Sequence, residues 1–192
     1  MAILKHFSVK NRFYSSAVEY LTCQFDEYTN KPVLDEKGRI QERENYLIAG
    51  VNCDVDSFGA ECIEVNRLYG KNNSIKDVKA HHYIISFEPN DLITMEQALE
   101  FGKQWLSAFA PGHQAVVAVH PDGHNGSQNM HIHMVINSVR KYAGKQCRWH
   151  DKPCEWKQGC KHKSTGKMMF HAKKWVMEKC IRLGFGQVDL LA

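Results

Sequence analysis

Hydrophobic and polar positions recur with two different periods along this chain, and together they predict nine elements. Short apolar runs bounded by polar residues are typical of strands, whereas apolar residues three and four positions apart indicate helices. The pattern predicts strands over 2–9, 46–51, 82–87, 115–119 and 130–137, and helices beginning near 16, 55, 94 and 168. In chain order these elements read β-α-β-α-β-α-β-β-α.

Local signals mark several of the boundaries. Ser16–Glu19 and Thr94–Gln97 both fit the capping box, in which a Ser or Thr side chain and a Glu or Gln side chain satisfy free backbone N–H groups. Gly184 is expected to end the last helix. The polar stretch 26–45, with a turn at 35–38, is predicted to be a hairpin or a mobile loop.

The last two strands are joined too tightly to be parallel. The connection 122–127 is rich in Gly, Asn and Asp, which favours an antiparallel hairpin. We therefore expect an α+β fold with a mostly antiparallel central sheet and helices packed against one face of it. The 192 residues are expected to form one domain, spanning 1–192.

Three histidines gather at this predicted hairpin. His131 and His133 are separated by one residue, so they project from the same face of a strand. His120 ends the preceding apolar run, and the hairpin would bring it beside the pair. A single histidine in a strand is usually a hydrogen-bonded structural residue, but three converging imidazoles indicate an open metal site.

The net charge of +4 conceals an uneven distribution of charge. Residues 140–182 hold thirteen Lys and Arg against three acids, while the remainder holds 12 basic and 18 acidic residues. This block is either a solvated lysine-rich face or a polyanion-binding surface, and the interleaved Trp149 and Trp156 would suit unstacked bases. The candidate contacts to nucleic acid are Lys141, Arg148, Lys157, Lys161 and Lys163.

Seven irregularly spaced cysteines do not resemble a secreted disulfide framework, so reduced thiols in a cytoplasm are expected. No apolar run approaches the ~18 residues that span a membrane, and the N-terminus lacks the apolar region of a signal peptide. Four zinc-type ligands occur late in the chain, but their spacing matches no standard zinc site. They are Cys147, Cys154, Cys160 and His162.

A metal site accompanied by a basic surface indicates phosphate chemistry, in which the attacking group is either an activated water or a side chain. Asp122, two residues beyond His120, could accept a proton or orient His120. Its alternative role is to favour the turn in Pro121-Asp-Gly.

At this point several motifs resemble a known family. The segment 16–22 contains Tyr20, Asn52-Cys-Asp precedes a helix, His82–Ser86 forms a strand, and 118–137 carries the three histidines. In order and spacing they resemble the HUH endonucleases, and most closely the conjugative relaxases of the MOB-P type. The resemblance covers most of residues 15–140 and is weakest after Arg140.

The resemblance implies the HUH/relaxase palm fold and assigns a role to each motif. Tyr20 would be the nucleophile, with Tyr14 and then Tyr28 as less favoured alternatives, and Ser86 and Asn137 would support the site. The metal would be Mn²⁺ or Mg²⁺. Ligand softness alone favours zinc, manganese, nickel or copper over magnesium, so Zn²⁺ or Ni²⁺ is expected where it is abundant during purification.

The implied activity is site- and strand-specific nicking of DNA at an origin of transfer (oriT). A 5′-phosphotyrosine would form and the strand would be resealed after conjugative transfer. The implied partners are oriT single strand with an adjacent hairpin, a relaxosome accessory protein and a type IV secretion coupling protein. The protein would act in the bacterial cytoplasm, travel with the DNA to the recipient, and form the N-terminal part of a longer chain.

Two other interpretations stay open. A rolling-circle replication initiator or HUH transposase would share the chemistry, although many of these place the tyrosine after the histidines. A non-catalytic nucleic-acid-binding module with a structural zinc belongs to a different class. Covalent attachment to DNA separates a relaxase from a binder.

Overall fold

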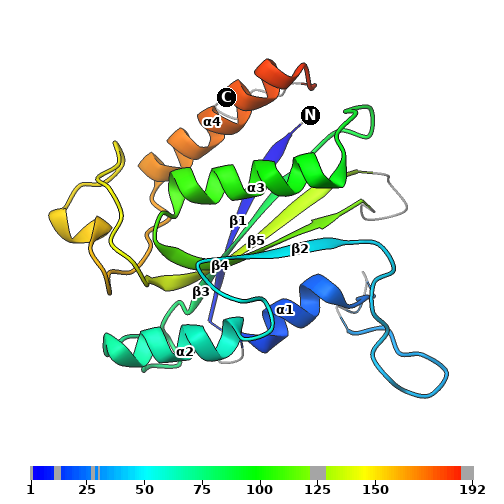
Figure 1. Cartoon of the computed structure of the whole chain (residues 1–192), viewed down its shortest axis with the longest axis horizontal. Helices are drawn as coiled ribbons and strands as arrows, with labels where there is room; N and C mark the ends of the chain where they lie inside the picture. Colours follow the sequence, from blue (N-terminus) through cyan, green and yellow to red (C-terminus); the bar gives the residue numbers. More distant parts are fainter. Residues whose placement is uncertain (1, 11–13, 27–28, 30, 122–128, 187–192) are drawn as a thin grey trace.

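The computed structural model describes residues 2–10, 14–26, 29, 31–121 and 129–186. In this part of the chain a sheet of five strands has the order β1-β3-β5-β4-β2, and each neighbouring pair is antiparallel (Figure 1). The predicted antiparallel sheet is thus confirmed. The strands are β1 Ile3–Val9, β2 Leu47–Val51, β3 Ala80–Ser86, β4 His113–His120 and β5 His131–Arg140.

Helices cover both faces of the sheet, with α3 and α4 on one side and α1 and α2 on the other (Figure 1). The expectation of helices on a single face was therefore wrong. The apolar run 115–119 in β4 has no polar position and is buried throughout, as expected of a strand covered on both sides. The helices are α1 Ser15–Thr22, α2 Phe58–Leu68, α3 Met95–Phe109 and α4 Gly166–Leu183, with a short 3₁₀ helix, η2, at Pro153–Trp156.

Each face of the sheet has its own hydrophobic core. The larger one, under α3 and α4, includes Tyr83, Trp105 and Met134, which are fully buried. The smaller one, under α1 and α2, includes Leu21 and Phe58. Because α1 packs on the second face, its last turn is held against the side of the sheet from which His131 and His133 project.

The helix boundaries test the predicted caps. Thr94 and Gln97 form both hydrogen bonds of a capping box at the start of α3, and Gly184, with φ 73°, ends α4 in the left-handed conformation. The predicted box at Ser16 was wrong, because α1 begins at Ser15 and its N-cap is Tyr14, whose side chain accepts no hydrogen bond from the backbone of the helix. Packing of α1 on the sheet, rather than a local cap, sets where this helix begins.

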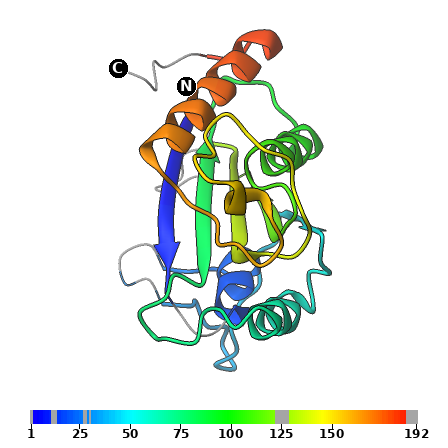
Figure 2. The same cartoon turned by 90° about the vertical axis from the view of Figure 1, so that its left-hand side faces the viewer.

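The irregular stretch 141–165, here called the basic segment, connects β5 to α4. It runs across one end of the sheet, in front of the strands (drawn in yellow in Figure 2). A bridge between Val139 and Lys161 and a backbone hydrogen bond between Arg140 and Cys160 attach it there.

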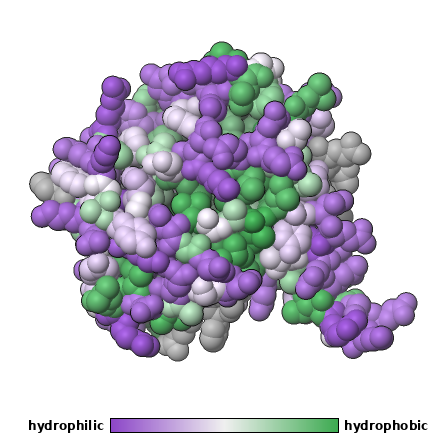
Figure 3. All heavy atoms as spheres, viewed as in Figure 1, coloured by the Kyte–Doolittle hydropathy of each residue, from purple (hydrophilic) through white to green (hydrophobic). Residues whose placement is uncertain are grey.

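Strand β2 forms one edge of the sheet, and β1 forms the other. The five residues of β2 are half-buried, and an apolar area framed by hydrophilic side chains occupies the centre of this view of the molecule (Figure 3). Among the described residues, no helix combines the length and apolar character required to cross a bilayer.

Candidate metal centre and nucleophile

The hairpin of β4 and β5 brings the three histidines together. His120 at the end of β4 pairs in register with His131 at the start of β5, and His133 lies one side-chain repeat further along the same face. One ring nitrogen from each residue lies within 4.8 Å of the others. In the part of the chain that the structure describes, no other group of three or more His, Cys, Asp or Glu residues is placed to share an ion.

His120 has a defined tautomer. Its Nε2 lies 2.8 Å from the carbonyl oxygen of Leu21 in α1, and because a carbonyl only accepts, Nε2 carries the proton. The lone pair is then on Nδ1, which is buried and has no hydrogen-bond partner. Burial lowers the pKa of His120 to about 3, so the ring is neutral at pH 7.

The other two rings are also oriented by hydrogen bonds. His131 Nδ1 donates to the carbonyl of Asn129 at 2.9 Å. His133 Nδ1 lies 2.9 Å from Nε2 of His82, while its own Nε2 is buried without a partner. Burial holds the pKa of His133 well below the usual range and that of His82 at about 4.

These observations fit a metal centre. A buried ring nitrogen without a partner costs about 1–3 kcal/mol, and two such atoms, His120 Nδ1 and His133 Nε2, lie within the histidine cluster. Each ligand is oriented through its other nitrogen, as metal-binding histidines generally are. His120, His131 and His133 could therefore hold one divalent ion and leave further coordination positions open.

Tyr20 lies beside this cluster. It is half-buried in the last full turn of α1, and its ring centroid is 6.0 Å from that of His133 and 6.0 Å from that of His82. The next residue, Leu21, supplies the carbonyl that orients His120. The structure thus places the predicted nucleophile next to the predicted metal ligands.

Tyr14, the alternative nucleophile, lies at the other end of α1 and is only 4% exposed. Its hydroxyl accepts a hydrogen bond from Asn66 Nδ2 at 2.7 Å and donates to the carbonyl of Lys79 at 3.0 Å or to Asn137 Oδ1 at 3.2 Å. Burial raises its pKa well above 10. These contacts favour a structural role for Tyr14, while Tyr28 and Asp122 lie outside the described residues.

The two predicted supporting residues occupy different places. Ser86 pairs directly with His131 across β3 and β5, so it lies at the edge of the histidine cluster. Asn137 is fully buried four residues beyond His133, and its amide bonds to Tyr14 and Gln114. Asn137 therefore fixes the packing of α1 rather than contacting the cluster.

The sequence analysis did not predict that His82 orients His133, and it named His82 only as a member of a motif. The signal was available in the alternation of β3, since Ala80, His82 and Ser86 share the face that carries the cluster. The carbonyl of Leu21 left no such signal, because backbone groups cannot be distinguished by residue type.

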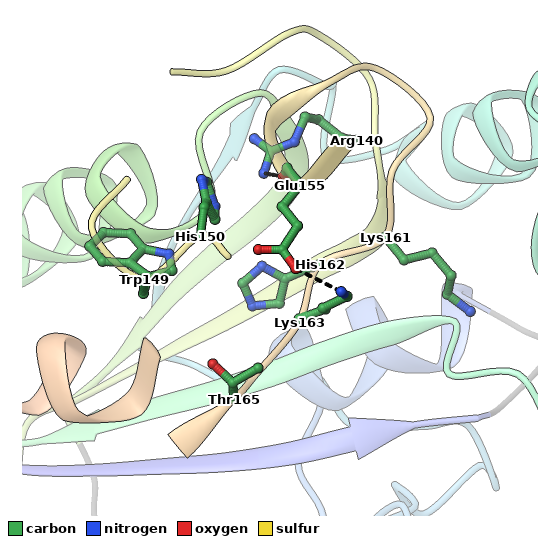
Figure 4. Close-up of a pocket in the computed structure, with 8 residues that line it drawn as sticks. All are labelled: Arg140, Trp149, His150, Glu155, Lys161, His162, Lys163 and Thr165. Carbon is green, nitrogen blue, oxygen red and sulfur yellow. Dashed lines mark hydrogen bonds and ion pairs between the residues drawn. The ribbon is translucent and has the colours of Figure 1, made fainter. Parts of the chain in front are cut away.

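The basic segment lies away from the cluster. His131 begins β5 and Arg140 ends it, so the two ends are about 30 Å apart at 3.3 Å per residue. Three of the five predicted DNA contacts form ion pairs within the protein, and Figure 4 shows that of Lys163 with Glu155. The pairs are Lys141–Glu61 at 2.9 Å, Lys161–Asp77 at 3.5 Å and Lys163–Glu155 at 2.7 Å. Arg148 and Lys157 are exposed.

The four zinc-type ligands of the basic segment do not converge. Cys147, Cys154 and Cys160 are free thiols, and His162 Nε2 is hydrogen-bonded to the Tyr83 hydroxyl at 2.8 Å. Of the two alternatives raised by the sequence, the structure favours free thiols.

Comparison with known proteins identifies the class to which this fold and site belong. Residues 28–165 match the family model described as Relaxase: MobA/VirD2-like, nuclease domain. A 98-residue region is 38% identical to Protein rlx of Staphylococcus aureus, covering 51% of this chain and 29% of that protein. Over 93 residues the chain is 40% identical to the group II intron-interrupted relaxase LtrB of Lactococcus lactis subsp. cremoris strain MG1363, covering 48% of this chain and 14% of LtrB.

The chain belongs to the MobA/VirD2-like relaxase family and contains its nuclease domain. It aligns with less than a third of the length of these relatives. The family favours the relaxase interpretation over the replication initiator, the transposase and the non-catalytic binder. The matched range begins after Tyr20, so the argument for this nucleophile depends on its position in the structure.

Proposed function

We propose that this domain nicks one strand of DNA at an origin of transfer by transesterification through Tyr20. The observation that carries the proposal is the 6.0 Å separation between the rings of Tyr20 and His133, within a cluster of histidines suited to a metal. Family membership supports nicking of DNA in general, and the tyrosine chemistry goes beyond it.

In the proposed reaction the Tyr20 oxygen attacks the scissile phosphorus, and the bond from phosphorus to the 3′ oxygen breaks. The strand that follows the nick becomes linked through a 5′-phosphotyrosine, and the strand before it ends in a 3′-hydroxyl. The phenol loses a proton and the departing oxygen gains one. One phosphodiester replaces another, so the 3′-hydroxyl can later reverse the reaction and reseal a strand.

The three imidazoles provide ligands for a divalent ion, for which we propose Mn²⁺ or Mg²⁺ in the cell. When bound, such an ion offsets negative charge on the phosphodiester. The protein's own contribution is orientation, because Leu21, Asn129 and His82 fix the three rings before DNA arrives.

The proposed substrate is single-stranded DNA with an adjacent hairpin. Lys141, Arg148, Lys157, Lys161 and Lys163 would contact phosphates about 30 Å from the cut, at the far end of β5. As partners we propose a relaxosome accessory protein and a type IV secretion coupling protein. We place the reaction in the bacterial cytoplasm, before transfer to a recipient.

The test is covalent capture from a pool of single strands with a randomised centre, labelled at the 3′ end and incubated with Mn²⁺. The transesterase leaves the 3′ label attached to protein through denaturing electrophoresis, and chelation of the metal abolishes the adduct. Labelled strand that shifts in native gels but never becomes covalent indicates a pure binder. Cleavage without attachment indicates a metal-dependent hydrolase, and either result overturns the proposal.

A further inference from the structure

An arginine that the proposed reaction does not yet use lies beside the metal centre. The connection from α1 to β2 folds back on itself and returns to the end of α1 (drawn in light blue in Figure 1). There the backbone N–H of Arg43 donates to the carbonyl of Thr22 at 2.9 Å, and a neighbouring antiparallel bridge holds this pairing. Arg43 is therefore fixed opposite the residue that follows Leu21, whose carbonyl contacts His120.

The side chain of Arg43 is turned towards the protein. The residue is half-buried, and its Nε atom is buried. Burial lowers the pKa of His120 most, and the positive charge of Arg43 is the next largest cause. The same charge adds to burial and to the neighbouring histidines in lowering the pKa of His133. The rings of His120 and His133 lie 4.7 Å apart, so the guanidinium is close to both proposed ligands.

A permanent positive charge at this position opposes the binding of a metal ion. Arginine keeps its proton in proteins, and like charges repel most where water is partly excluded. The carbonyl end of α1 offsets this repulsion only in part, because a helix end carries about half an elementary charge. The arrangement becomes favourable when an anion lies between the guanidinium and the ion. A phosphodiester, with one negative charge, is such an anion.

A guanidinium is suited to the oxygens of a phosphate. Its planar N–H groups can donate to two oxygens at once, in a geometry that a lysine cannot reproduce. The non-bridging oxygens of the scissile phosphate carry negative charge as Tyr20 attacks. Donors that are fixed at those oxygens in advance stabilise the transition state. The pairing of Arg43 with Thr22 fixes the backbone from which this side chain extends.

We propose that Arg43 donates hydrogen bonds to the non-bridging oxygens of the scissile phosphate and is a catalytic residue of the nicking reaction. The proposal rests on the proposed function, because it takes the phosphate at the metal centre as given. It assigns a role to a residue of the polar stretch 26–45, for which the sequence predicted only a hairpin or a mobile loop.

The first experiment measures the affinity for Mn²⁺ by titration calorimetry without DNA. Arg43→Gln removes a charge that repels the ion and should tighten binding by about three- to tenfold. Arg39, on the same connection, has a side chain that is 72% exposed and pairs with Asp35 at 2.8 Å. Arg39→Gln is therefore the matched control and should bind Mn²⁺ as the wild type does. Replacement of a purely structural residue would not tighten binding, so unchanged or weaker binding in Arg43→Gln overturns the proposal.

The second experiment tests contact with the phosphate, in a Tyr20→Phe background that prevents cleavage. The strand is one recovered by covalent capture, with either its normal scissile phosphate or a neutral methylphosphonate at that position. With Arg43 present, the methylphosphonate should weaken binding by at least about tenfold, as expected for loss of a charged hydrogen bond. With Arg43→Gln most of this loss should disappear, because the partner is already gone. At saturating Mn²⁺ the contribution of the ion is common to both proteins.

A methylphosphonate at a distant phosphate of the same strand is the control, and its effect should not depend on Arg43. In the cleavage-competent protein, Arg43→Gln should slow adduct formation by at least about 100-fold. Arg43→Lys keeps the charge without the planar fork, so its rate should lie between the two. Equal losses from the scissile methylphosphonate with and without Arg43 overturn this proposal alone. A wild-type protein that forms no adduct with any strand contradicts the proposed function as well.

Discussion

The Nε2 atom of His120 lies 2.8 Å from the carbonyl oxygen of Leu21, the residue that follows Tyr20. The helix that carries the proposed nucleophile is therefore hydrogen-bonded to one of the proposed metal ligands. A shift of α1 would move Tyr20 and release His120 together. Attack and metal binding should consequently respond as one unit to changes in the packing of this helix.

The two ends of α1 should behave differently when their tyrosines are changed. Tyr20→Phe removes one oxygen beside the histidine cluster and should abolish the covalent adduct while metal uptake and stability remain. Peptide mapping of the wild-type adduct should identify residue 20 as the attached side chain.

Tyr14→Phe is the matched variant. It should keep the adduct but lower the free energy of unfolding by about 1–3 kcal/mol, because Asn66 Nδ2 and its neighbours lose a buried partner. Denaturant titration measures the loss. An adduct that maps to Tyr14 would show that the nucleophile assignment is wrong and leave the relaxase class intact.

His131→Ala removes a proposed metal ligand and should weaken binding of Mn²⁺ by at least about 100-fold. The loss of a residue that only orients a ligand usually costs about 10–100-fold. Titration calorimetry gives the affinity, and crystals soaked in Mn²⁺ should show anomalous scattering among the three rings. His171→Ala changes a histidine in α4 that is not part of the cluster and should bind the ion normally. Equal affinity in the two variants would contradict the metal centre.

His82→Ala should weaken metal binding by about 10–100-fold, because His133 loses the partner that orients it. His81 is adjacent in sequence but contacts His6 on the opposite face of β3, so His81→Ala should leave the affinity unchanged. A His82→Ala protein with wild-type affinity would show that the hydrogen bond has no positioning role.

Glu61 provides a prediction for the acid range. The hydrogen bond from Lys141 holds the pKa of Glu61 at about 2, below its usual value near 4.5. At pH values between about 2 and 4.5, Glu61 takes up a proton more readily in the unfolded chain than in the folded protein. The ion pair of Glu61 with Lys141 therefore stabilises the fold fully above pH 4.5 and progressively less as the pH falls towards 2.

Glu61→Gln should therefore cost about 1 kcal/mol at pH 7, as expected for a partly exposed pair, and progressively less below pH 4.5. Chemical denaturation at a series of pH values measures this difference. Glu64→Gln changes an exposed residue of the same helix and serves as the control. A cost that stays constant down to pH 2 would assign the effect to packing instead of charge.

Arg148 and Lys157 are exposed residues of the basic segment, and their neutralisation should reduce the salt dependence of single-strand binding. Each lost phosphate contact lowers the slope of log affinity against log salt by about 0.7. Lys163→Gln should have a smaller effect, because this lysine already pairs with Glu155. An unchanged slope in the double variant would make the segment a solvated surface.

The sequence was sufficient to predict features that depend on local order. The hairpin of β4 and β5 follows from a short polar connection between two apolar runs, and it alone pairs His120 with His131. The sequence analysis did not predict that helices cover both faces of the sheet. The uninterrupted apolar run 115–119 indicated it, because a strand with one face in solvent would alternate apolar and polar residues. Contacts such as that of Leu21 with His120 join residues 99 positions apart, and residue type carries no information about them.

The position of the basic segment shows the same limit. Its charge was evident from the sequence, but charge does not determine which end of a sheet a segment covers. The direction of β5 and the bridge from Val139 to Lys161 place it far from His131. Only the three-dimensional path of the chain separates these two sets of residues.

The length of α1 has a consequence for where the proposed nucleophile lies. One end of this helix is anchored through the Tyr14 hydroxyl to Asn66 and to the carbonyl of Lys79, and the other end borders the metal centre through Leu21. Such a helix acts as a rigid arm of fixed length. One inserted residue would lengthen it by about 1.5 Å and rotate Tyr20 by about 100° relative to Tyr14. The Tyr20 ring would then leave its place beside His133, although the anchor at Tyr14 would be intact.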